Sequence, residues 1–426
     1  MSENLEKLLR VLKSSEADAW EVTETREKGW EFYLIRHALD QNRVKELTSF
    51  QVKVYRKTEE IMGSAGAPIP PDATETEMAR RIAELCQEAS YVRNPVYRLN
   101  TPEKETDAVP ESGSPVDLKA ISRDFLQTVA ALPETDTEDL NSCEIFVSEI
   151  RRRFLNSEGI DVTAVYPRSM TEAVVNARRD GQEIELYRMY HSGTCDREQL
   201  TRDLTETMRY GRDKLTARPT PPLEKADVIL STDAACEVYD YFITRLSAAA
   251  IYRGISNWKM GDQAAPETMT LRTVPQLPNS SRNAAYDSEG ARIRERMLLD
   301  GGKVVGLWGN RQFSQYLGLT DSFIASNFVI EGGKASAEEI RRGDYLEIVE
   351  FSDFQVDAVT GDIAGEIRLG YLHRGNETVS VSGGSVSGNM SELIPKMAFS
   401  AESRQYDCMR IPAVTRLNGA TVTGAV

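Results

Sequence analysis

The spacing of hydrophobic residues changes within the first 60 positions. Four leucines near the start recur at helical spacing and predict a short amphipathic helix: Leu5, Leu8, Leu9 and Leu12. From about residue 19 to residue 56 the period becomes two, over residues 20–23, 30–35 and 50–55. This alternation predicts three strands of an antiparallel sheet that has one polar face.

Helical and strand-like patterns then follow one another up to residue 220. Helices are expected over residues 75–91, 116–132 and 197–215. Strands are expected over residues 143–155, 163–166, 174–177 and 183–190. The polar, acidic and proline-rich stretch at about 101–115 predicts a loop or an ordered connection between helices.

The second half of the chain begins after Arg-Pro-Thr-Pro-Pro at 218–222, which predicts a linker. A short strand over 226–231 precedes a helix for which Asp233 is the expected N-cap, and glycine-rich strands follow. Ser336 and Glu339 predict one later helix start through a capping box. The fold class is therefore expected to be α+β, with an N-terminal sheet-and-helix domain at 1–220 and a β-dominated domain at 221–426.

Charge and composition exclude several classes of protein. There are 51 Lys plus Arg against 66 Asp plus Glu, a net charge of −15, which argues against binding to nucleic acid or to an anionic membrane. No apolar run is long enough to span a membrane, and the first 20 residues do not resemble a signal peptide. Five scattered cysteines without a CxxC pair predict reduced thiols, so we expect a cytoplasmic protein.

Few residues offer candidate chemistry. The three histidines lie far apart, and phosphate-binding and nucleophile-elbow motifs are absent. Asp287 and Glu289 precede Gly290, so these three are candidates for a peptide-binding cleft; the alternative is a turn in which Asp287 caps backbone amides. Cys408 is either a nucleophile or metal ligand, or a packed thiol. Gly-Gly-Ser-Val-Ser-Gly at 383–388 predicts a hairpin turn.

An ordered series of segments over about residues 225–425 resembles the TldD/PmbA family, formerly called "modulator of DNA gyrase". The segments are DVILSTDAACEVYDYF, IYRGISNWKMGDQ, NAAYDSEGARIRERMLLDGGKVVGLW, IEGGKASAEEI, DAVTGDIAGEIRLGYLHRG, SVSGNMSELIPKMAFS and IPAVTRLNGATVTGA. The resemblance implies a bacterial or archaeal protein of two α+β domains. It also implies a dimer that encloses a cavity and acts on small or unfolded peptides.

The resemblance further implies where a metal would bind. TldD-type members carry a zinc-binding HExxxH motif on the helix after the first strand of this region, and a cysteine near the C-terminus. PmbA-type (TldE) members lack the motif. The corresponding helix here reads STDAACEVYDYF from Ser231 and has no histidine. A cryptic zinc site would have only Cys236, Asp240 and Cys408 as ligands, with Glu237 as the base.

We therefore expect a non-catalytic PmbA-type subunit without a cofactor. It would form a homodimer, or a heterodimer with a TldD-type zinc peptidase, and exposed strand edges would bind an extended peptide by β-addition. Two alternatives stay open at this point. One is an active metallopeptidase with an atypical zinc site, and the other is a protein that interacts with DNA gyrase.

Overall fold

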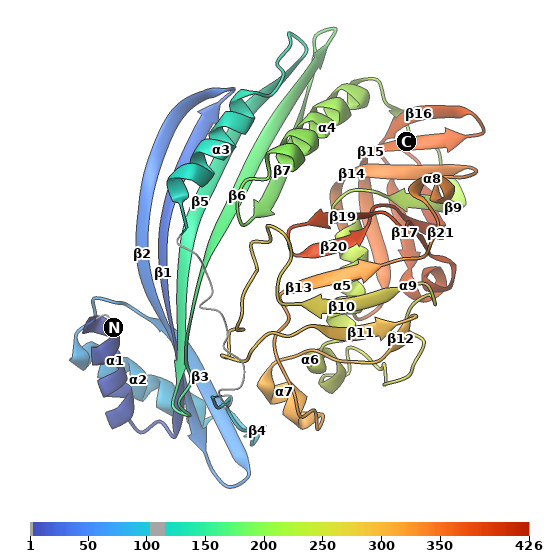
Figure 1. Ribbon diagram of the computed structural model, residues 1–426. Helices are drawn as coiled ribbons and strands as arrows, with labels where there is room; N and C mark the ends of the chain where they lie inside the picture. The colour runs from blue at the N-terminus through green and yellow to red at the C-terminus, as the bar shows by residue number, and fades with distance from the viewer. Residues whose placement is uncertain (1–2, 103–115, 426) are drawn as a thin grey trace.

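The N-terminal half is built on a curved antiparallel sheet of seven strands (Figure 1). The computed structural model describes residues 3–102 and 116–425. In pairing order the strands are β4 (Asn94–Pro95), β3 (Ile61–Ile69), β2 (Ala38–Lys57), β1 (Ala19–Ile35), β5 (Glu138–Asn156), β6 (Asp161–Arg179) and β7 (Gln182–Ser192). Residues 103–115 of the expected loop lie outside the described residues.

The strands of this sheet are longer than the hydrophobic pattern predicts. The expected strands at 20–23 and 30–35 are both parts of β1, and those at 163–166 and 174–177 are both parts of β6. The prediction failed because the intervening residues are polar, for example 23–28 in β1. Pairing with β2 and β5 on its two sides satisfies the β1 backbone there, so no apolar face is needed to keep the strand extended.

Four helices pack against the sheet, and all lie where helical spacing predicts them. They are α1 (Glu3–Ser14), α2 (Glu75–Ser90), α3 (Leu118–Ala130) and α4 (Arg197–Leu215). The helices α1 and α2 form one core with the end of the sheet near β3, through residues such as Leu8, Val52 and Ile82. The helices α3 and α4 form a second core over β5, β6 and β7, which includes Val129 and Leu204.

The C-terminal half contains two further sheets (Figure 1). The larger one comprises, in order, β14 (Tyr345–Val356), β9 (Leu223–Leu230), β21 (Thr415–Thr423), β17 (Ser385–Asn389), β15 (Asp362–Arg374), β16 (Glu377–Ser382) and β8 (Arg218–Pro219), with β18 (Ala398–Phe399) against β21. The smaller one comprises β12 (Lys303–Val304), β11 (Arg296–Asp300), β10 (Thr270–Val274), β13 (Asn327–Glu331), β20 (Met409–Pro412) and β19 (Ser403–Tyr406). Because β14 also pairs with β15, five strands of the larger sheet close into a ring.

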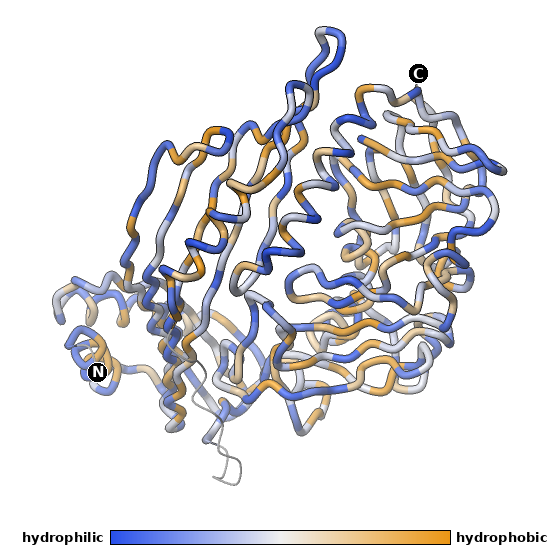
Figure 2. Tube along the Cα trace, turned by 45° about the horizontal axis from the view of Figure 1, so that its top comes forward, coloured by the Kyte–Doolittle hydropathy of each residue, from blue (hydrophilic) through white to orange (hydrophobic). Residues whose placement is uncertain are grey.

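One helix, α5 (Ala235–Arg245), supplies much of the core of this half. Val238, Tyr239 and Phe242 on α5 are fully buried in a cluster with residues of both sheets. Hydrophobic and hydrophilic residues alternate along the surrounding strands (Figure 2), as expected where one strand face is buried. The remaining short helices are α6 (Ala248–Tyr252), α7 (Arg311–Tyr316), α8 (Ala337–Ile340), α9 (Met390–Leu393) and the 3-10 helix η1 (Ile394–Lys396).

Three local predictions can be compared with the structure. Ser336 and Glu339 form the expected capping box at α8. Asp233 is not the N-cap of α5; Ala234 occupies that position in a helical conformation, with no side-chain cap. The segment at 383–388 is not a hairpin turn, because β16 and β17 lie in line along the same edge of β15 and Gly383 and Gly384 both pair with Ile367 between them.

The expected α+β class is confirmed, with a β-dominated C-terminal half. The boundary at residue 220 stays a prediction: α4 packs on β6 and β7 but also contacts β16 of the C-terminal half. Among the residues the structure describes, no helix combines the length and apolar character needed to cross a membrane.

Candidate functional site

Two adjoining cavities lie between the N-terminal sheet and the C-terminal half. We call the first the sheet cavity; it has a volume of about 570 Å³ and is walled by β1, β5 and β6 and by the loops 281–288 and 324–326. We call the second the helix cavity; it has a volume of about 420 Å³ and is walled by α4, the start of α5, β7 and the β19–β20 hairpin. His191, Arg282 and Asp407 line both cavities, so the two meet at these side chains.

The helix cavity lies between the outermost strands of two sheets. Residues 188–192 of β7 and 404–406 of β19 line it, and each strand is the last of its sheet. The Tyr406 hydroxyl donates a hydrogen bond to the Ser231 carbonyl oxygen at 3.1 Å. This contact holds the Tyr406 ring beside the segment that connects β9 to α5. Arg404 pairs with Asp203 at 2.7 Å and with Glu206 at 3.1 Å.

The residues expected on and around α5 are only partly brought together. Cys236, Glu237 and Cys408 line the helix cavity, whereas Asp240 lines neither cavity and accepts a 3.3 Å hydrogen bond from Thr244. Burial raises the pKa of both Cys236 and Cys408, so both are protonated thiols at neutral pH and poor nucleophiles. Burial, and then the charges of Asp240 and Asp233, raise the pKa of Glu237.

These residues do not fit a zinc ion. A catalytic zinc site needs three converging protein ligands and an open position. Within residues 3–102 and 116–425 no three His, Cys, Asp or Glu side chains come close enough together to hold a metal. Cys236 and Cys408 share a cavity, but the third ligand of the cryptic set, Asp240, points elsewhere.

The carboxylate of Asp287 is committed to the backbone. Asp287 is 4% exposed; its Oδ1 accepts hydrogen bonds from the amides of Glu289 at 2.8 Å and Ala291 at 2.9 Å. Its Oδ2 accepts one from the Ile324 amide at 2.7 Å. Although Asp287 borders the sheet cavity, these contacts match the alternative of a turn in which it caps backbone amides.

Glu289 and Gly290 line neither cavity, and instead join the two halves of the chain. Burial raises the pKa of Glu289 to about 7, and its Oε2 accepts a hydrogen bond from the Arg311 amide at 2.8 Å. Asn100 donates to the Glu289 carbonyl oxygen at 3.0 Å. Gly290 has φ +73°, and a Cβ there would lie 2.7 Å from Cδ1 of Phe154 in β5.

Sequence reasoning missed the residues at which the cavities meet. His191 is the next-to-last residue of β7, and Arg282 lies in a loop. Asp407 lies in the β19–β20 turn, where it accepts hydrogen bonds from the amide and hydroxyl of Ser281, both at 2.7 Å. No spacing rule connects three positions so far apart in the chain. They come together where the two halves pack against each other.

Comparison with known proteins identifies the C-terminal half. Residues 223–424 match the family described as the PmbA/TldA metallopeptidase C-terminal domain. A metalloprotease PmbA homologue of Haemophilus influenzae is 21% identical over 206 residues, which cover 46% of this chain and 44% of that protein. A metalloprotease of Methanothermobacter thermautotrophicus is 28% identical over 219 residues, covering 45% and 47% of the two chains. The chain thus spans about half the length of the curated relatives it matches.

Solved structures share the fold over the whole chain. TldE from Thermococcus kodakarensis superposes with a TM-score of 0.77 at 17% identity, covering 99% of this chain and all (100%) of that one. A proposed modulator of DNA gyrase from Bacteroides thetaiotaomicron has a TM-score of 0.79 at 17% identity and covers 99% of each chain. The C-terminal half thus matches the PmbA/TldD family, and the chain as a whole has the fold of these solved structures.

Proposed function

We propose that this chain is a non-catalytic subunit of the PmbA (TldE) type in a TldD/PmbA peptidase system that acts on small or unfolded peptides. One observation carries the proposal: α5, the helix on which the resemblance implies a zinc motif in TldD-type members, presents Cys236 and Glu237 and no histidine to the helix cavity. The helix and the cavity are present here, but the residues described do not form a zinc ligand set. A subunit that binds peptides without hydrolysing them needs the cavity but needs no zinc ligands.

The walls of the helix cavity support binding of an extended chain. A peptide lying between β7 and β19 would meet the outer edges of two sheets, whose backbone groups can pair with it by β-addition. Main-chain pairing depends little on sequence, which suits a protein that handles many peptides. Tyr190 and Tyr406 add aromatic surface on opposite sides of the cavity.

A partner subunit completes the proposal. A TldD-type subunit would supply zinc-bound water for hydrolysis, while this chain binds and orients the peptide and excludes water. A homodimer that binds peptides without cleaving them is the second arrangement we consider. In either case we expect the complex to act in the cytoplasm.

The experiment measures metal content and peptide cleavage of the purified chain after incubation with zinc. We expect no stoichiometric zinc by mass spectrometry and no hydrolysis of an unfolded substrate such as casein, in the wild type and in Cys236→Ala and Cys408→Ala alike. Hydrolysis should begin when a TldD-type subunit that co-purifies with the chain is added. Stoichiometric zinc with cleavage by the chain alone, lost in either cysteine variant, would overturn the proposal.

The DNA gyrase alternative has one observation in its favour. Solved structures with this fold from Thermotoga maritima and Bacteroides thetaiotaomicron are described as proposed modulators of DNA gyrase. The net charge of −15 disfavours contact with DNA but permits contact with a protein. If tagged chain retains no gyrase subunit from a lysate, this alternative is removed.

A further inference from the structure

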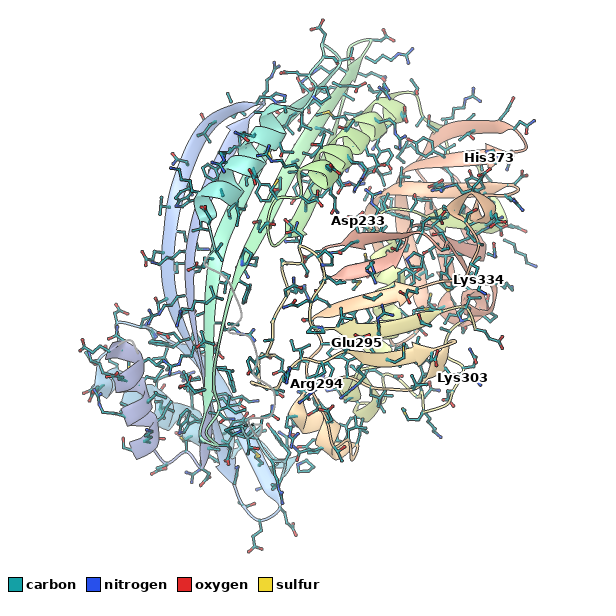
Figure 3. All side chains as sticks on the ribbon, in the orientation of Figure 1. Asp233, Arg294, Glu295, Lys303, Lys334 and His373 are labelled. Atoms are coloured by element: carbon teal, nitrogen blue, oxygen red, sulfur yellow. The ribbon has the colours of Figure 1, made fainter. Side chains whose placement is uncertain are left out.

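Charged side chains that form no ion pair line both cavities. In the helix cavity, Asp233 and Glu237 are four residues apart at the start of α5, and both side chains are exposed. Neither carboxylate accepts a hydrogen bond or forms an ion pair with any residue the structure describes. In Figure 3, Asp233 is labelled in the C-terminal half, beside β19 and below α4.

The other carboxylates of the helix cavity are already matched. Asp203 and Glu206 pair with Arg404, and Asp196 accepts from the Gln199 amide at 3.0 Å as the N-cap of α4. Asp407 is held by Ser281. Arg188, the other arginine of this wall, is paired with the buried Glu350. The uncompensated negative charge of this cavity is therefore located at α5.

The sheet cavity is lined by as many carboxylates as cationic side chains: Glu27, Glu31, Asp287 and Asp407 against Lys45, Arg152, Arg168 and Arg282. Glu27 pairs with Lys45 at 3.4 Å, Glu31 accepts from the Tyr33 hydroxyl at 3.1 Å, and Asp287 is satisfied by backbone amides. Of the arginines that line the sheet cavity, Arg152 donates only to the Tyr286 carbonyl oxygen at 3.3 Å, which does not neutralise it.

The other two arginines of the sheet cavity are also poorly compensated. Arg168 reaches Glu27 only at 3.7 Å, with its side chain 52% exposed. Arg282, where the cavities meet, forms no side-chain hydrogen bond or ion pair among the described residues. Arg152 and Arg282 therefore have no carboxylate partner among the described residues, and Arg282 stands where the two cavities meet.

We propose that the joined cavities bind an extended peptide in one direction, with its terminal ammonium against Asp233 and Glu237 and its terminal carboxylate toward Arg282 and Arg152. This inference rests on the proposed function, since it assigns the orientation of the peptide in that site. A peptide with two charged ends is complementary to this arrangement in one direction, and the reversed peptide places like charges together at both ends. Partly enclosed walls strengthen the effect, because charges there are screened less than on an open surface.

The test measures binding of penta-alanine, its N-acetyl form, its C-terminal amide and the doubly blocked form by isothermal titration calorimetry. For the wild type, we expect N-acetylation to weaken binding about tenfold, as loss of one charge-assisted contact does. In the double variant Asp233→Asn, Glu237→Gln, the free and acetylated peptides should bind equally. In Arg282→Gln, the preference for a terminal carboxylate over the amide should fall while the preference for a free amino terminus remains.

Matched controls are Glu366→Gln and Arg374→Gln, which remove exposed charges on β15 outside both cavities. Both should retain the wild-type preferences. Equal binding of all four peptides by the wild type would overturn the orientation and leave peptide binding intact. The orientation would also be overturned if Arg282→Gln lost the preference for a free amino terminus while the double variant Asp233→Asn, Glu237→Gln kept it. If none of the peptides binds, the proposed function itself fails.

Discussion

Two groups of carboxylates near the junction of the halves have opposite environments. Asp287 and Glu289 lie in the loop that joins the C-terminal half to the N-terminal sheet, and backbone amides donate to both oxygens of Asp287 and to one oxygen of Glu289. Asp233 and Glu237 at α5 are exposed to a cavity and have no partner among the described residues. The same two residue types therefore hold the fold together in one place and face a cavity in the other.

Whether a carboxylate is structural or available for binding depends on how many of its oxygens already accept hydrogen bonds, and not on the residue type. A carboxylate whose oxygens are all used by backbone amides cannot also bind a ligand without breaking the loop it organises. A carboxylate that faces a cavity and accepts no hydrogen bond can bind a ligand without breaking any structural contact. We therefore expect large stability losses at Asp287 and Gly290 and small ones at Asp233 and Glu237.

Removing the Asp287 carboxylate should have the largest effect. Asp287→Ala leaves the amides of Glu289, Ala291 and Ile324 without acceptors in a buried site. We expect a loss of about 3 kcal/mol in the free energy of unfolding, since each unsatisfied buried donor costs roughly 1–3 kcal/mol. Urea denaturation measures it. Asp287→Asn, which keeps one acceptor oxygen, should lose less; equal losses for Ala and Asn would contradict the hydrogen-bond explanation.

Gly290 tests the packing of the same loop. With φ +73° and Phe154 2.7 Å from the position of a Cβ, Gly290→Ala introduces both backbone strain and a clash with a buried ring. We expect a destabilisation of about 2 kcal/mol by thermal or urea unfolding. Gly318→Ala is the control, because it has φ +72° but nothing within 4 Å of the added Cβ, so it carries the strain without the clash. Equal losses in the two variants would show that Phe154 does not matter.

Glu289 makes the stability of the loop depend on pH. Burial raises its pKa in the folded protein to about 7, whereas the unfolded chain ionises near the ordinary value of 4.5. The stabilisation that this residue contributes is complete below pH 4.5 and is lost as the pH rises through 7. Glu289→Gln should therefore gain about 2 kcal/mol relative to the wild type between pH 5 and pH 8. Urea titrations at both pH values measure it, and a constant difference would contradict the burial argument.

Much of the fold could be predicted from local patterns. Helices α1, α2, α3 and α4 lie where the 3.6-residue period placed them, because each packs one apolar stripe on a sheet. The long strands could not be predicted in full. Their polar middle sections are held by pairing on both sides, and hydrophobic alternation does not report such pairing.

The candidate site could be predicted less well. The family resemblance located α5, and the residue types there pointed to a missing zinc site. Cys408 was placed near α5 by resemblance, and it does share the helix cavity with Cys236. The junction formed by His191, Arg282 and Asp407 depends on how the two halves pack against each other. That packing follows from buried contacts such as Gly290 against Phe154, which have no signature in the sequence.

The smallest changes in the free energy of unfolding are expected at Asp233 and Glu237. Asp233→Asn and Glu237→Gln remove exposed charges that make no hydrogen bond with the described residues, so each should change the free energy of unfolding by less than about 0.5 kcal/mol. Burial, and then the charges of Asp240 and Asp233, raise the pKa of Glu237, so the double variant also removes repulsion among these carboxylates. Urea denaturation at pH 7 measures all three variants. A loss as large as that of Asp287→Ala would mean that these carboxylates hold the fold, and it would remove the distinction between the two groups. A negligible loss, together with a changed preference for peptide ends, would show that the first turn of α5 is kept acidic for binding.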